Sequence, residues 1–289
     1  MKILIIGGSG FLGKYLIQQG IKKSHDITVF DINDPEISEI NFRKGDILNK
    51  NELNKAIKGM DIVYNMAAMS DIEDCIKNPT ECIKYNVLGN TYILDACVQN
   101  NIKRYVYASS VYSGGNHGGF YAISKKTSED IIKQYNKYYN LEYTILRYGT
   151  LFGTGAPQTN SIQKFLTDAL NNKVINYRGD GNETREYIHV EDASILSYQI
   201  LADWYKNQTI SLTGESRIKV KDLLLMVNEI VGNVEIKYNT RIDKTDMGHY
   251  KISPYSFKRE NIIKLSKTQN RDLGDSLIEI LENISYDKS

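Results

Sequence analysis

Several features that often reveal a protein's role are absent from this sequence. Charge of one sign is missing, because 36 Lys and Arg balance 35 Asp and Glu in 289 residues and leave a net charge of +1. Without a field of one sign or a Lys/Arg-rich run, we expect no partnership with nucleic acid or an anionic membrane. Long apolar runs are also missing, and none approaches the roughly 18 residues that span a bilayer.

Cysteine and histidine are scarce. The four histidines are scattered without the spacing of metal ligands. The three cysteines are Cys75, Cys82 and Cys97, and they form no C-x-x-C pair. An odd number of cysteines is typical of a reducing compartment. The opening run "ILII" (3–6) is too short for the apolar core of a secretion signal. We therefore expect a soluble cytoplasmic protein with no structural metal.

The first 150 residues alternate short apolar runs with helical stretches. We predict strands at 2–7, 26–31, 40–46, 61–68, 103–110 and 142–149, and helices near 11–20, 50–58, 79–100 and 121–140. This alternation is typical of an α/β fold, a Rossmann-like doubly wound parallel sheet. After residue 150 this alternation ends, and we expect a smaller, less regular region with helices at 218–232 and 272–284.

A glycine loop follows the first apolar run. The stretch "GGSGFLG" (7–13) fits G-x-x-G-x-x-G from Gly7 and G-x-G-x-x-G from Gly8. In either register, small residues let the backbone turn tightly and approach a pyrophosphate, which then faces free N–H groups of the next helix. A flexible turn is the alternative, but the position between a strand and a helix favours a dinucleotide site.

Asp31 ends the second predicted strand, 18 residues after Gly13. A carboxylate at this place can accept hydrogen bonds from the adenosine ribose hydroxyls and repels a 2′-phosphate. A solvated Asp at a strand end is the alternative, and the spacing disfavours it. The sequence therefore predicts NAD rather than NADP as the cofactor.

Tyr121 and Lys125 stand four residues apart in "GGFYAISKKTSED" (118–130). On a helix this spacing places the phenol and the ammonium on one face. The chain has 21 tyrosines, so about two Tyr-x-x-x-Lys matches are expected by chance, and this is the one match present. An exposed helical pair is the alternative. The pair follows "YASS" (107–110), however, the end of a predicted strand, and this places it at the carboxyl edge of the sheet, where ligands bind.

With these motifs the chain resembles the extended short-chain dehydrogenase/reductase family, in its NAD-dependent nucleotide-sugar epimerase and dehydratase branch. The resemblance covers nearly the whole chain. It rests on "GGSGFLG", "GDI" (45–47), "NMAA" (65–68), "NPTECIKYNVLGNTYILDAC" (78–97), "YASS", "YAISK" (121–125), "LRYGTLFG" (146–153) and "TREYIHVEDA" (184–193). It implies an NAD-binding Rossmann domain over 1–152 with a return segment near 185–210. Residues 153–289 are then mainly a substrate-binding domain.

The resemblance implies a role for each matching residue. Tyr121 takes a hydroxyl proton as hydride leaves the same carbon, after Lys125 and the positive nicotinamide lower its pKa from the usual value of about 10. The implied substrate contacts are Ser110, which is also catalytic, Thr150, and Arg185 at the diphosphate. The implied cofactor contacts are Gly7, Gly10, Phe11, Leu12, Gly13, Asp31, Asp46 at the adenine ring, Ile47, Ala67, Ala68, Ser109, Tyr121 and Lys125.

The sequence departs from the family pattern beside Ser110. The family usually continues Ser-Ser-x-x-Val-Tyr-Gly, whereas Val111 and Tyr112 follow Ser110 at once, so the substrate loop is short. The same two residues stand where 4,6-dehydratases carry an Asp-Glu pair, and without a carboxylate the elimination of water is disfavoured. Thr150 also replaces the asparagine that the family places near the diphosphate.

We predict an enzyme, a nucleotide-sugar 4-epimerase that acts by transient oxidation at C4, similar to UDP-glucose 4-epimerase. A 4-ketoreductase, or another sugar oxidoreductase or dehydratase on the same scaffold, is the alternative. A non-catalytic dinucleotide sensor is more remote, because such proteins typically lose Tyr121 or Lys125. We also expect a homodimer through the helices near 79–100 and 121–140, whose apolar residues cover a wide arc: Ile93, Ile131, Ile132, Tyr135 and Tyr139.

Overall fold

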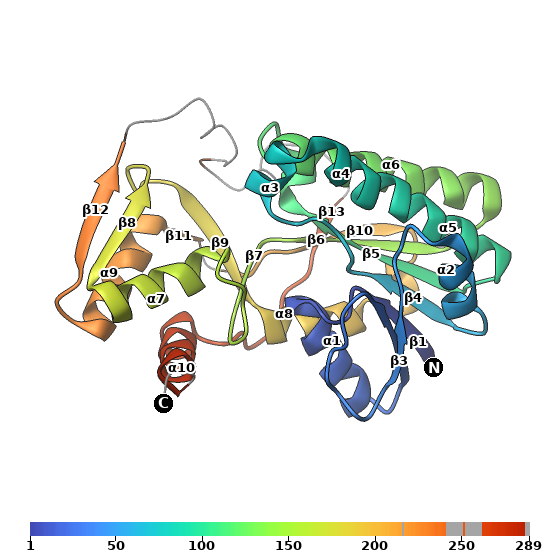
Figure 1. The fold of residues 1–289 in the computed structure, drawn as a ribbon, viewed down its shortest axis with the longest axis horizontal. Coiled ribbons are helices and arrows are strands. Elements are labelled where there is room, and N and C mark those ends of the chain that lie inside the picture. The colour runs from blue at the N-terminus through green and yellow to red at the C-terminus, as the bar shows by residue number, and fades with distance from the viewer. Residues whose placement is uncertain (216, 241–250, 252–261, 287–289) are drawn as a thin grey trace.

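A computed structural model describes residues 1–215, 217–240, 251 and 262–286 of the chain (Figure 1). Its centre is an eight-stranded sheet whose neighbouring strands all run parallel. The strand order is β13 (Ile262–Lys264), β10 (Gln208–Leu212), β6 (Tyr143–Tyr148), β5 (Arg104–Ser110), β4 (Ile62–Asn65), β1 (Lys2–Ile6), β2 (Asp26–Asp31) and β3 (Asn41–Lys44). The predicted Rossmann-like doubly wound sheet is confirmed. The order reverses between β1 and β4, which is where such folds bind ligands.

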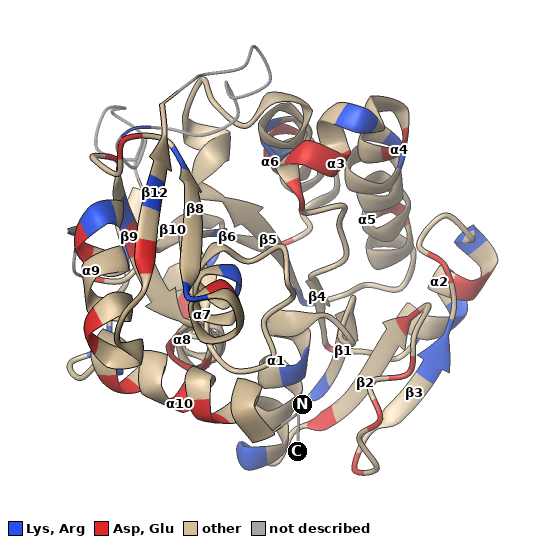
Figure 2. Cartoon of the chain, turned by 60° about the vertical axis from the view of Figure 1, so that its left-hand side comes forward, with Lys and Arg blue, Asp and Glu red and all other residues tan. Residues whose placement is uncertain are grey.

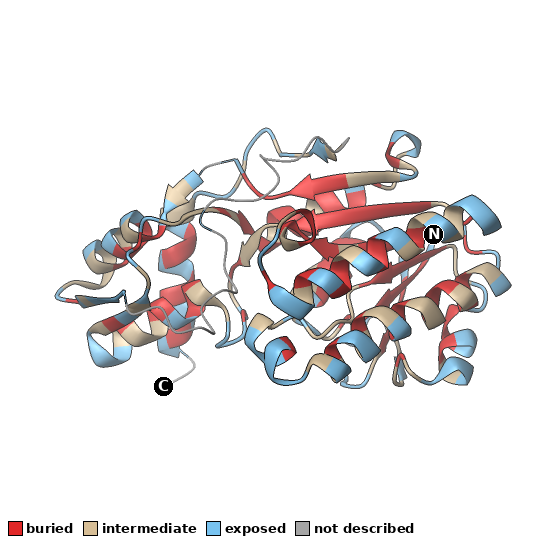
Figure 3. Cartoon of the chain, turned by 90° about the horizontal axis from the view of Figure 1, so that it is seen from above, coloured by how far each residue is buried: buried red, intermediate tan, exposed pale blue. Residues whose placement is uncertain are grey.

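Strand β1 is apolar throughout its buried part because helices cover both faces of the sheet. Ile3 and Ile5 belong to one core, which includes α1 (Phe11–Lys22) and α8 (Val190–Gln199). Leu4 and Ile6 belong to the other, which includes α2 (Lys50–Ile57), α5 (Asn90–Gln99) and α6 (Gly119–Tyr139). Each such side chain contributes about 1.5–3 kcal/mol when fully buried. Figure 3 shows the consequence, with buried strands inside helices whose outer faces are exposed.

The predicted helix over 79–100 consists of three parts. Pro79 starts α4 (Pro79–Ile83), a π-helical turn η1 (Lys84–Gly89) follows, and α5 continues to Gln99. A short helix that was not predicted, α3 (Ile72–Lys77), precedes them. These helices and α6 form one layer over the sheet (Figure 1).

The apolar arc of these helices divides into a buried and an outer part. Ile93 and Ile132 are buried in the core under α5 and α6. They face the sheet because β5 and β6 offer a wide apolar surface to this layer. Ile131 and Tyr135 are partly buried, and Tyr139 is exposed.

The rest of the chain forms a smaller part beside the main sheet. Its strands make a three-stranded and a two-stranded sheet: β7 (Thr150–Phe152), β9 (Thr184–His189) and β11 (Arg217–Lys219), then β8 (Val174–Arg178) and β12 (Glu235–Asn239). Helices α7 (Ser161–Asn172), α9 (Val220–Val231) and α10 (Leu273–Tyr286) supply a separate apolar core. The chain returns to the main sheet twice, at β10 and β13.

The charge distribution agrees with the balanced composition. Figure 2 shows basic and acidic residues interspersed over the described helices and strands. Among those residues no helix is both long enough and apolar enough to cross a membrane. The same residues contain no group of three or more His, Cys, Asp or Glu side chains that could hold a metal ion.

Candidate active site

The predicted catalytic residues meet at the carboxyl edge of the main sheet. Strand β5 ends at Ser110, which pairs in register with Tyr148 at the end of β6. A 3-10 turn η2 (Val111–Gly114) follows, and α6 begins at Gly119, so Tyr121 lies in its first turn. Eleven residues of chain therefore lead from Ser110 back to Tyr121 beside it.

Three side chains form the centre of the site. The Ser110 hydroxyl lies close enough to the phenol of Tyr121 to lower its pKa. The Lys125 ammonium lies 5.9 Å from the centre of the Tyr121 ring and 4.9 Å from that of Tyr107. Lys125 is buried, and its Nζ donates to the carbonyl oxygen of Ala108 at 2.7 Å. Two of its three protons remain for other acceptors.

Burial dominates the electrostatics of this centre. It raises the pKa of Tyr121 to about 12, although the nearby Ser110 hydroxyl lowers it. It also lowers the pKa of Lys125 to about 8. We expected Lys125 to bring the pKa of Tyr121 below its usual value, and in the chain alone the opposite holds. The reason is that removing the phenol from water penalises the phenolate.

Tyr112 lies next to the catalytic centre. Its ring meets the Tyr121 ring edge-on, with the ring centres 6.2 Å apart, and its backbone N–H donates to Ser110 Oγ at 3.3 Å. Gly118 makes room for this ring, because a Cβ there would lie 2.7 Å from Tyr112 Cδ1. The position that holds a carboxylate in 4,6-dehydratases thus presents an aromatic ring.

The glycine loop has the form that a pyrophosphate site needs. Gly7 has φ +78°, and a Cβ there would lie 2.5 Å from the backbone nitrogen of Ala67. A Cβ on Gly13 would lie 2.5 Å from the carbonyl oxygen of Gly8. Gly10 is the N-cap of α1, and the first turn has no acidic side chain. The N–H groups at the start of α1, from Phe11 onward, therefore suit an anion.

Asp31 lies beside the glycine loop, as an NAD site requires. One carboxylate oxygen accepts from the N–H of Ser9 at 3.0 Å and the other from the N–H of Asn33 at 3.0 Å. The side chain is partly exposed. Because a carboxylate offers about four lone pairs, acceptor capacity remains for ribose hydroxyls. These residues fit the adenosine end of NAD.

The other predicted cofactor residues line the same edge. Ala67 and Ala68 follow β4 directly across from Gly7 and are partly exposed. Asp46 lies in an open hollow at the start of α2, where its Oδ1 accepts from the N–H of Leu48. Ile47 is mostly buried and packs against Gly89, so it supports the hollow.

Ser109 does not present its hydroxyl to the sheet edge. The side chain is buried, and Oγ donates to Glu129 Oε1 at 2.5 Å. Alternate residues of a strand point to opposite faces, and Ser109 points under α6. We predicted this residue near the cofactor, and that contact stays a prediction.

The predicted substrate residues lie on the neighbouring small sheet. Thr150 begins β7 two residues after Tyr148, and it pairs in register with Tyr187 of β9. Arg185 precedes Tyr187 on β9 and is partly exposed. Arg271, a weaker candidate for a second diphosphate arginine, pairs instead with Glu191 at 3.0 Å and Glu279 at 2.6 Å.

Sequence reasoning missed several polar residues that support the site. Asn86, in the π-helical turn, bonds both backbone groups of Met69 and the hydroxyl of Ser124. Glu129 and Arg147 form a buried ion pair beneath η2. The one sequence feature that could have indicated Glu129 is its position, one helical turn after Lys125.

Comparisons with known proteins agree with this geometry. The sequence model of the NAD dependent epimerase/dehydratase family matches residues 3–210. A Methanocaldococcus jannaschii protein named "Putative UDP-glucose 4-epimerase" is 28% identical over 254 residues, covering 80% of this chain and 82% of that protein. A dTDP-D-glucose 4,6-dehydratase of Dictyostelium discoideum is 29% identical over 230 residues, covering 66% of this chain and 53% of that protein.

The fold matches solved structures over its full length. One is the UDP-glucuronic acid 4-epimerase from Bacillus cereus in complex with UDP-glucuronic acid and NAD, with a TM-score of 0.86 and 20% identity. The match covers 99% of each chain. Together with the family match and the glycine loop, these findings lead to one conclusion: the chain belongs to the NAD-dependent epimerase/dehydratase family of nucleotide-sugar enzymes, and its cofactor is NAD.

Proposed function

We propose that this enzyme is a nucleotide-sugar 4-epimerase, which oxidises C4 of the sugar transiently and reduces it from the other face. The observation that carries the proposal is the meeting of Ser110, Tyr121 and Lys125 at the sheet edge. Val111 and Tyr112 support it further, because this part of the site has no carboxylate for eliminating water.

Each of the three side chains has a chemical role in this proposal. The Tyr121 oxygen takes the proton of the C4 hydroxyl and later returns it. The Ser110 hydroxyl, which lies beside that phenol, bonds the sugar oxygen and keeps it within reach. The Lys125 ammonium stabilises the negative charge that forms on the phenol, since it is held near the ring by Ala108.

NAD, when bound, accepts the hydride from C4 and gives it back. The glycine loop, Asp31 and Ala67 hold the cofactor in the crevice between β1 and β4. In the chain alone the pKa of Tyr121 is about 12, so its phenol is protonated at neutral pH. We therefore expect the phenol to lose its proton only when cofactor and substrate are both in place. Arg185 and Thr150 would bind the diphosphate from the neighbouring sheet.

A substrate panel tests the proposal. The purified enzyme is incubated with UDP-, GDP-, CDP- and dTDP-sugars without added cofactor, and the C4 isomers are separated by chromatography. An epimerase converts at least one sugar under these conditions because it regenerates its cofactor in each cycle. Conversion that depends on added reduced nicotinamide indicates a 4-ketoreductase instead, and loss of water indicates a dehydratase.

Replacing Tyr121 with Phe tests the catalytic assignment. We expect kcat to fall by at least a thousandfold with little change in NAD affinity, because only the ionisable oxygen is lost. Tyr138→Phe makes the same change on the exposed side of the same helix and serves as the control. A Tyr121→Phe variant that turns over at the wild-type rate contradicts the assignment.

A further inference from the structure

A buried ion pair lies directly beneath the proposed catalytic centre. Arg147 on β6 bonds Glu129 on α6 through Nε at 2.8 Å and through Nη2 at 2.6 Å. The exposed fraction is 2% for the arginine side chain and 0% for the glutamate. Ion pairs this deep are costly, and apolar residues of similar volume often give a more stable fold. The pair therefore calls for an explanation other than stability.

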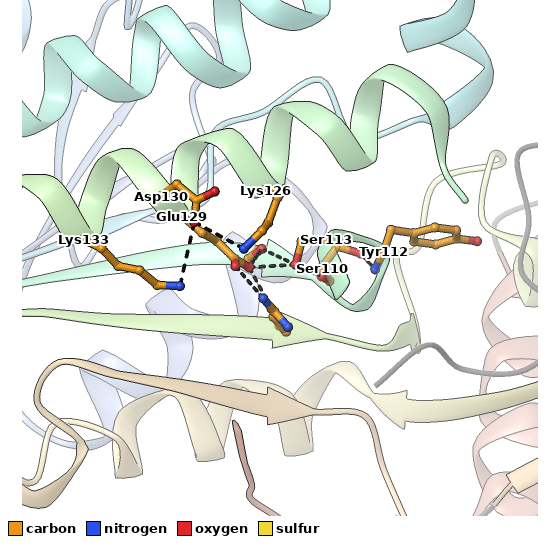
Figure 4. A network of polar contacts seen from close by, with 9 residues as sticks. Ser110, Tyr112, Ser113, Lys126, Glu129, Asp130 and Lys133 are labelled. Carbon is orange, nitrogen blue, oxygen red and sulfur yellow. Dashed lines mark hydrogen bonds and ion pairs between the residues drawn. The ribbon is translucent and has the colours of Figure 1, made fainter. Parts of the chain in front are cut away.

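The same carboxylate also fastens the turn that follows β5. Ser109 Oγ bonds Glu129 Oε1 at 2.5 Å, and Ser113 Oγ lies 2.7 Å from the same oxygen. Ser113 Oγ is also 2.8 Å from the carbonyl oxygen of Ser110. Figure 4 shows Ser113, on the turn next to Ser110, pointing toward Glu129. Ser110 thus lies between two residues that Glu129 holds.

Three successive turns of α6 contact three successive residues at the end of β5. Lys125 donates to Ala108, Glu129 accepts from Ser109, and Tyr121 lies next to Ser110, whose hydroxyl lowers the pKa of the phenol. The spacing of four residues places all three side chains on one face of the helix. Helix α6 and the end of β5 are therefore joined by a row of polar contacts. Tyr121 and Ser110 stand at the outer end of this row.

We propose that Glu129, together with Arg147, is a positioning residue that fixes Ser110 against Tyr121 by holding Ser109 and Ser113. This inference rests on the proposed function of Ser110, Tyr121 and Lys125. Glu129 does not reach the sheet edge itself and acts through the turn η2. A second consequence is electrostatic. Burial lowers the pKa of Lys125, and the negative charge of Glu129 offsets part of this lowering.

The main test compares Glu129→Gln with Asp130→Asn. Both remove one negative charge from α6, but Asp130 is exposed and pairs only with the surface residues Lys126 and Lys133 among the described contacts (Figure 4). We expect kcat to fall at least tenfold in Glu129→Gln, with KM changing less than threefold, and to stay within twofold in Asp130→Asn. A loss below threefold in Glu129→Gln, or an equal loss in both variants, overturns the proposal.

A pH profile separates positioning from general loosening of the fold. Cys75, Cys82, Tyr107 and Tyr121 also face the Lys125 ammonium, so only the change on removing Glu129 is interpreted. Removing a negative charge favours neutral lysine, and so the alkaline limb of the kcat profile should move to lower pH. Asp130→Asn should leave the alkaline limb of the kcat profile at the wild-type pH. If this limb also stays at the wild-type pH in Glu129→Gln, the proposed effect of Glu129 on the pKa of Lys125 is wrong.

Two further variants keep the test decisive if Glu129→Gln folds poorly. The double variant Glu129→Gln/Arg147→Met also removes the buried cation, and we expect it to regain the melting temperature but not kcat. Ser113→Ala frees one side of the turn without leaving a charge unpaired, and amide exchange at 110–115 should accelerate at least tenfold. Exchange as slow as in the wild type overturns the proposal. If no sugar is converted even by the wild type, the proposed function fails while the exchange measurement still decides the role of Glu129.

Discussion

The two ionisable groups of the proposed centre have pKa values shifted by the same cause in opposite directions. Burial raises the pKa of Tyr121 and lowers that of Lys125, because each residue loses solvation in its charged form. The site is thus prepared for a phenolate and an ammonium that stabilise each other, yet it disfavours either charge alone. Such an arrangement costs stability, which is common where a site must hold charge away from water.

Lys125 should therefore reduce the stability of the free protein. Its pKa falls from 10.5 to about 8, so Lys125→Met should raise the free energy of unfolding below pH 8. The gain is at most about 3 kcal/mol, less about 1 kcal/mol for the lost hydrogen bond to Ala108. Between these two pKa values the unfolded chain binds the proton more tightly, so wild-type stability rises with pH there. Urea unfolding on both sides of pH 8 measures this rise.

Comparing the wild type with Lys125→Met cancels the contributions of the other titrating groups to the pH dependence of stability. Because Lys125→Met has no ammonium at this position, the difference in unfolding free energy between wild type and variant should shrink as pH rises through the window. Lys126→Met, one residue along and partly exposed, should show a difference that is small and constant. A difference for Lys125→Met that does not depend on pH contradicts the lowered pKa.

Asp31 should set the choice between NAD and NADP. Replacing it with Ala removes an acceptor for the ribose and two bonds that hold the loop, to Ser9 and Asn33. We expect the Kd for NAD to rise at least tenfold, about 1.4 kcal/mol, and the preference over NADP to narrow. Calorimetric titration of both cofactors measures this. Asp34→Ala, an exposed neighbour, should change neither affinity, and a wild type that binds NADP as tightly as NAD contradicts this role.

At this scale the sequence predicts groups that are close in the chain better than groups that are distant. The spacing of Tyr121 and Lys125 places them on one helix face without any knowledge of the fold. The partners of Glu129 come instead from β5, η2 and β6, and Arg147 is 18 residues away. Their meeting depends on strand register, which the sequence does not specify locally. The raised pKa of Tyr121 in the chain alone could not be predicted for a related reason, since burial depends on all the neighbours of this residue.

Among the elements, the π-helical turn η1 has a clear structural role. It lets Asn86 reach across to the loop after β4 and to α6. The amide accepts from the N–H of Met69 at 2.8 Å and donates to its carbonyl at 2.9 Å and to Ser124 Oγ at 2.9 Å. Asn86 is buried, and Ser128 Oγ donates to its backbone carbonyl at 2.8 Å. Such turns are frequently found at functional sites.

Asn86→Ala should consequently destabilise the protein strongly. It leaves the N–H and carbonyl of Met69 without this partner in a partly buried place, so we expect a loss of roughly 2–3 kcal/mol in the free energy of unfolding. Asn54→Ala removes a similar amide bond, that of Asn100 to Asn54, but at the surface, and should cost less than about 0.5 kcal/mol. Chemical denaturation of both variants gives the comparison. Equal losses of unfolding free energy in the two variants would mean that the hydrogen bonds of Asn86 stabilise the fold no more than a surface hydrogen bond does.

Element prediction succeeded where the pattern was long or bounded by clear signals. Strands β1, β2, β4, β5 and β6 read as largely apolar runs because they are buried on both faces, and α9 was predicted from its amphipathic pattern and Gly232. The misses have physical causes. Helix α3 has only six residues, β13 only three, and the polar first turn of α8 hides its buried side. The π-helical turn has no composition of its own, because it arises from packing against α6.

On the scale of the whole molecule, the helical layer of α3, α4, η1 and α6 carries an exposed apolar strip. Its members are Ile76, Ile83, Leu88, Phe120 and Ile123. The elements that carry them contact one another, and Ile76 lies within van der Waals reach of Gly119 at the start of α6. An exposed apolar strip of this kind offers a surface for a partner. The helices that carry it lie on the opposite face of the main sheet from α1 and α8 (Figure 1).

We therefore still expect a homodimer, now through this apolar strip. Ile123 is its most exposed member at 58%, and Ile123→Glu places a charge where an apolar partner surface would lie. Light scattering at micromolar concentration should give the mass of two chains for the wild type and of one chain for the variant, with the Kd of the dimer raised at least tenfold. Leu225→Glu, an exposed leucine on α9, is the matched control and should remain dimeric. A wild-type protein that has the mass of one chain at this concentration rejects the dimer, and an Ile123→Glu variant that remains paired moves the interface elsewhere.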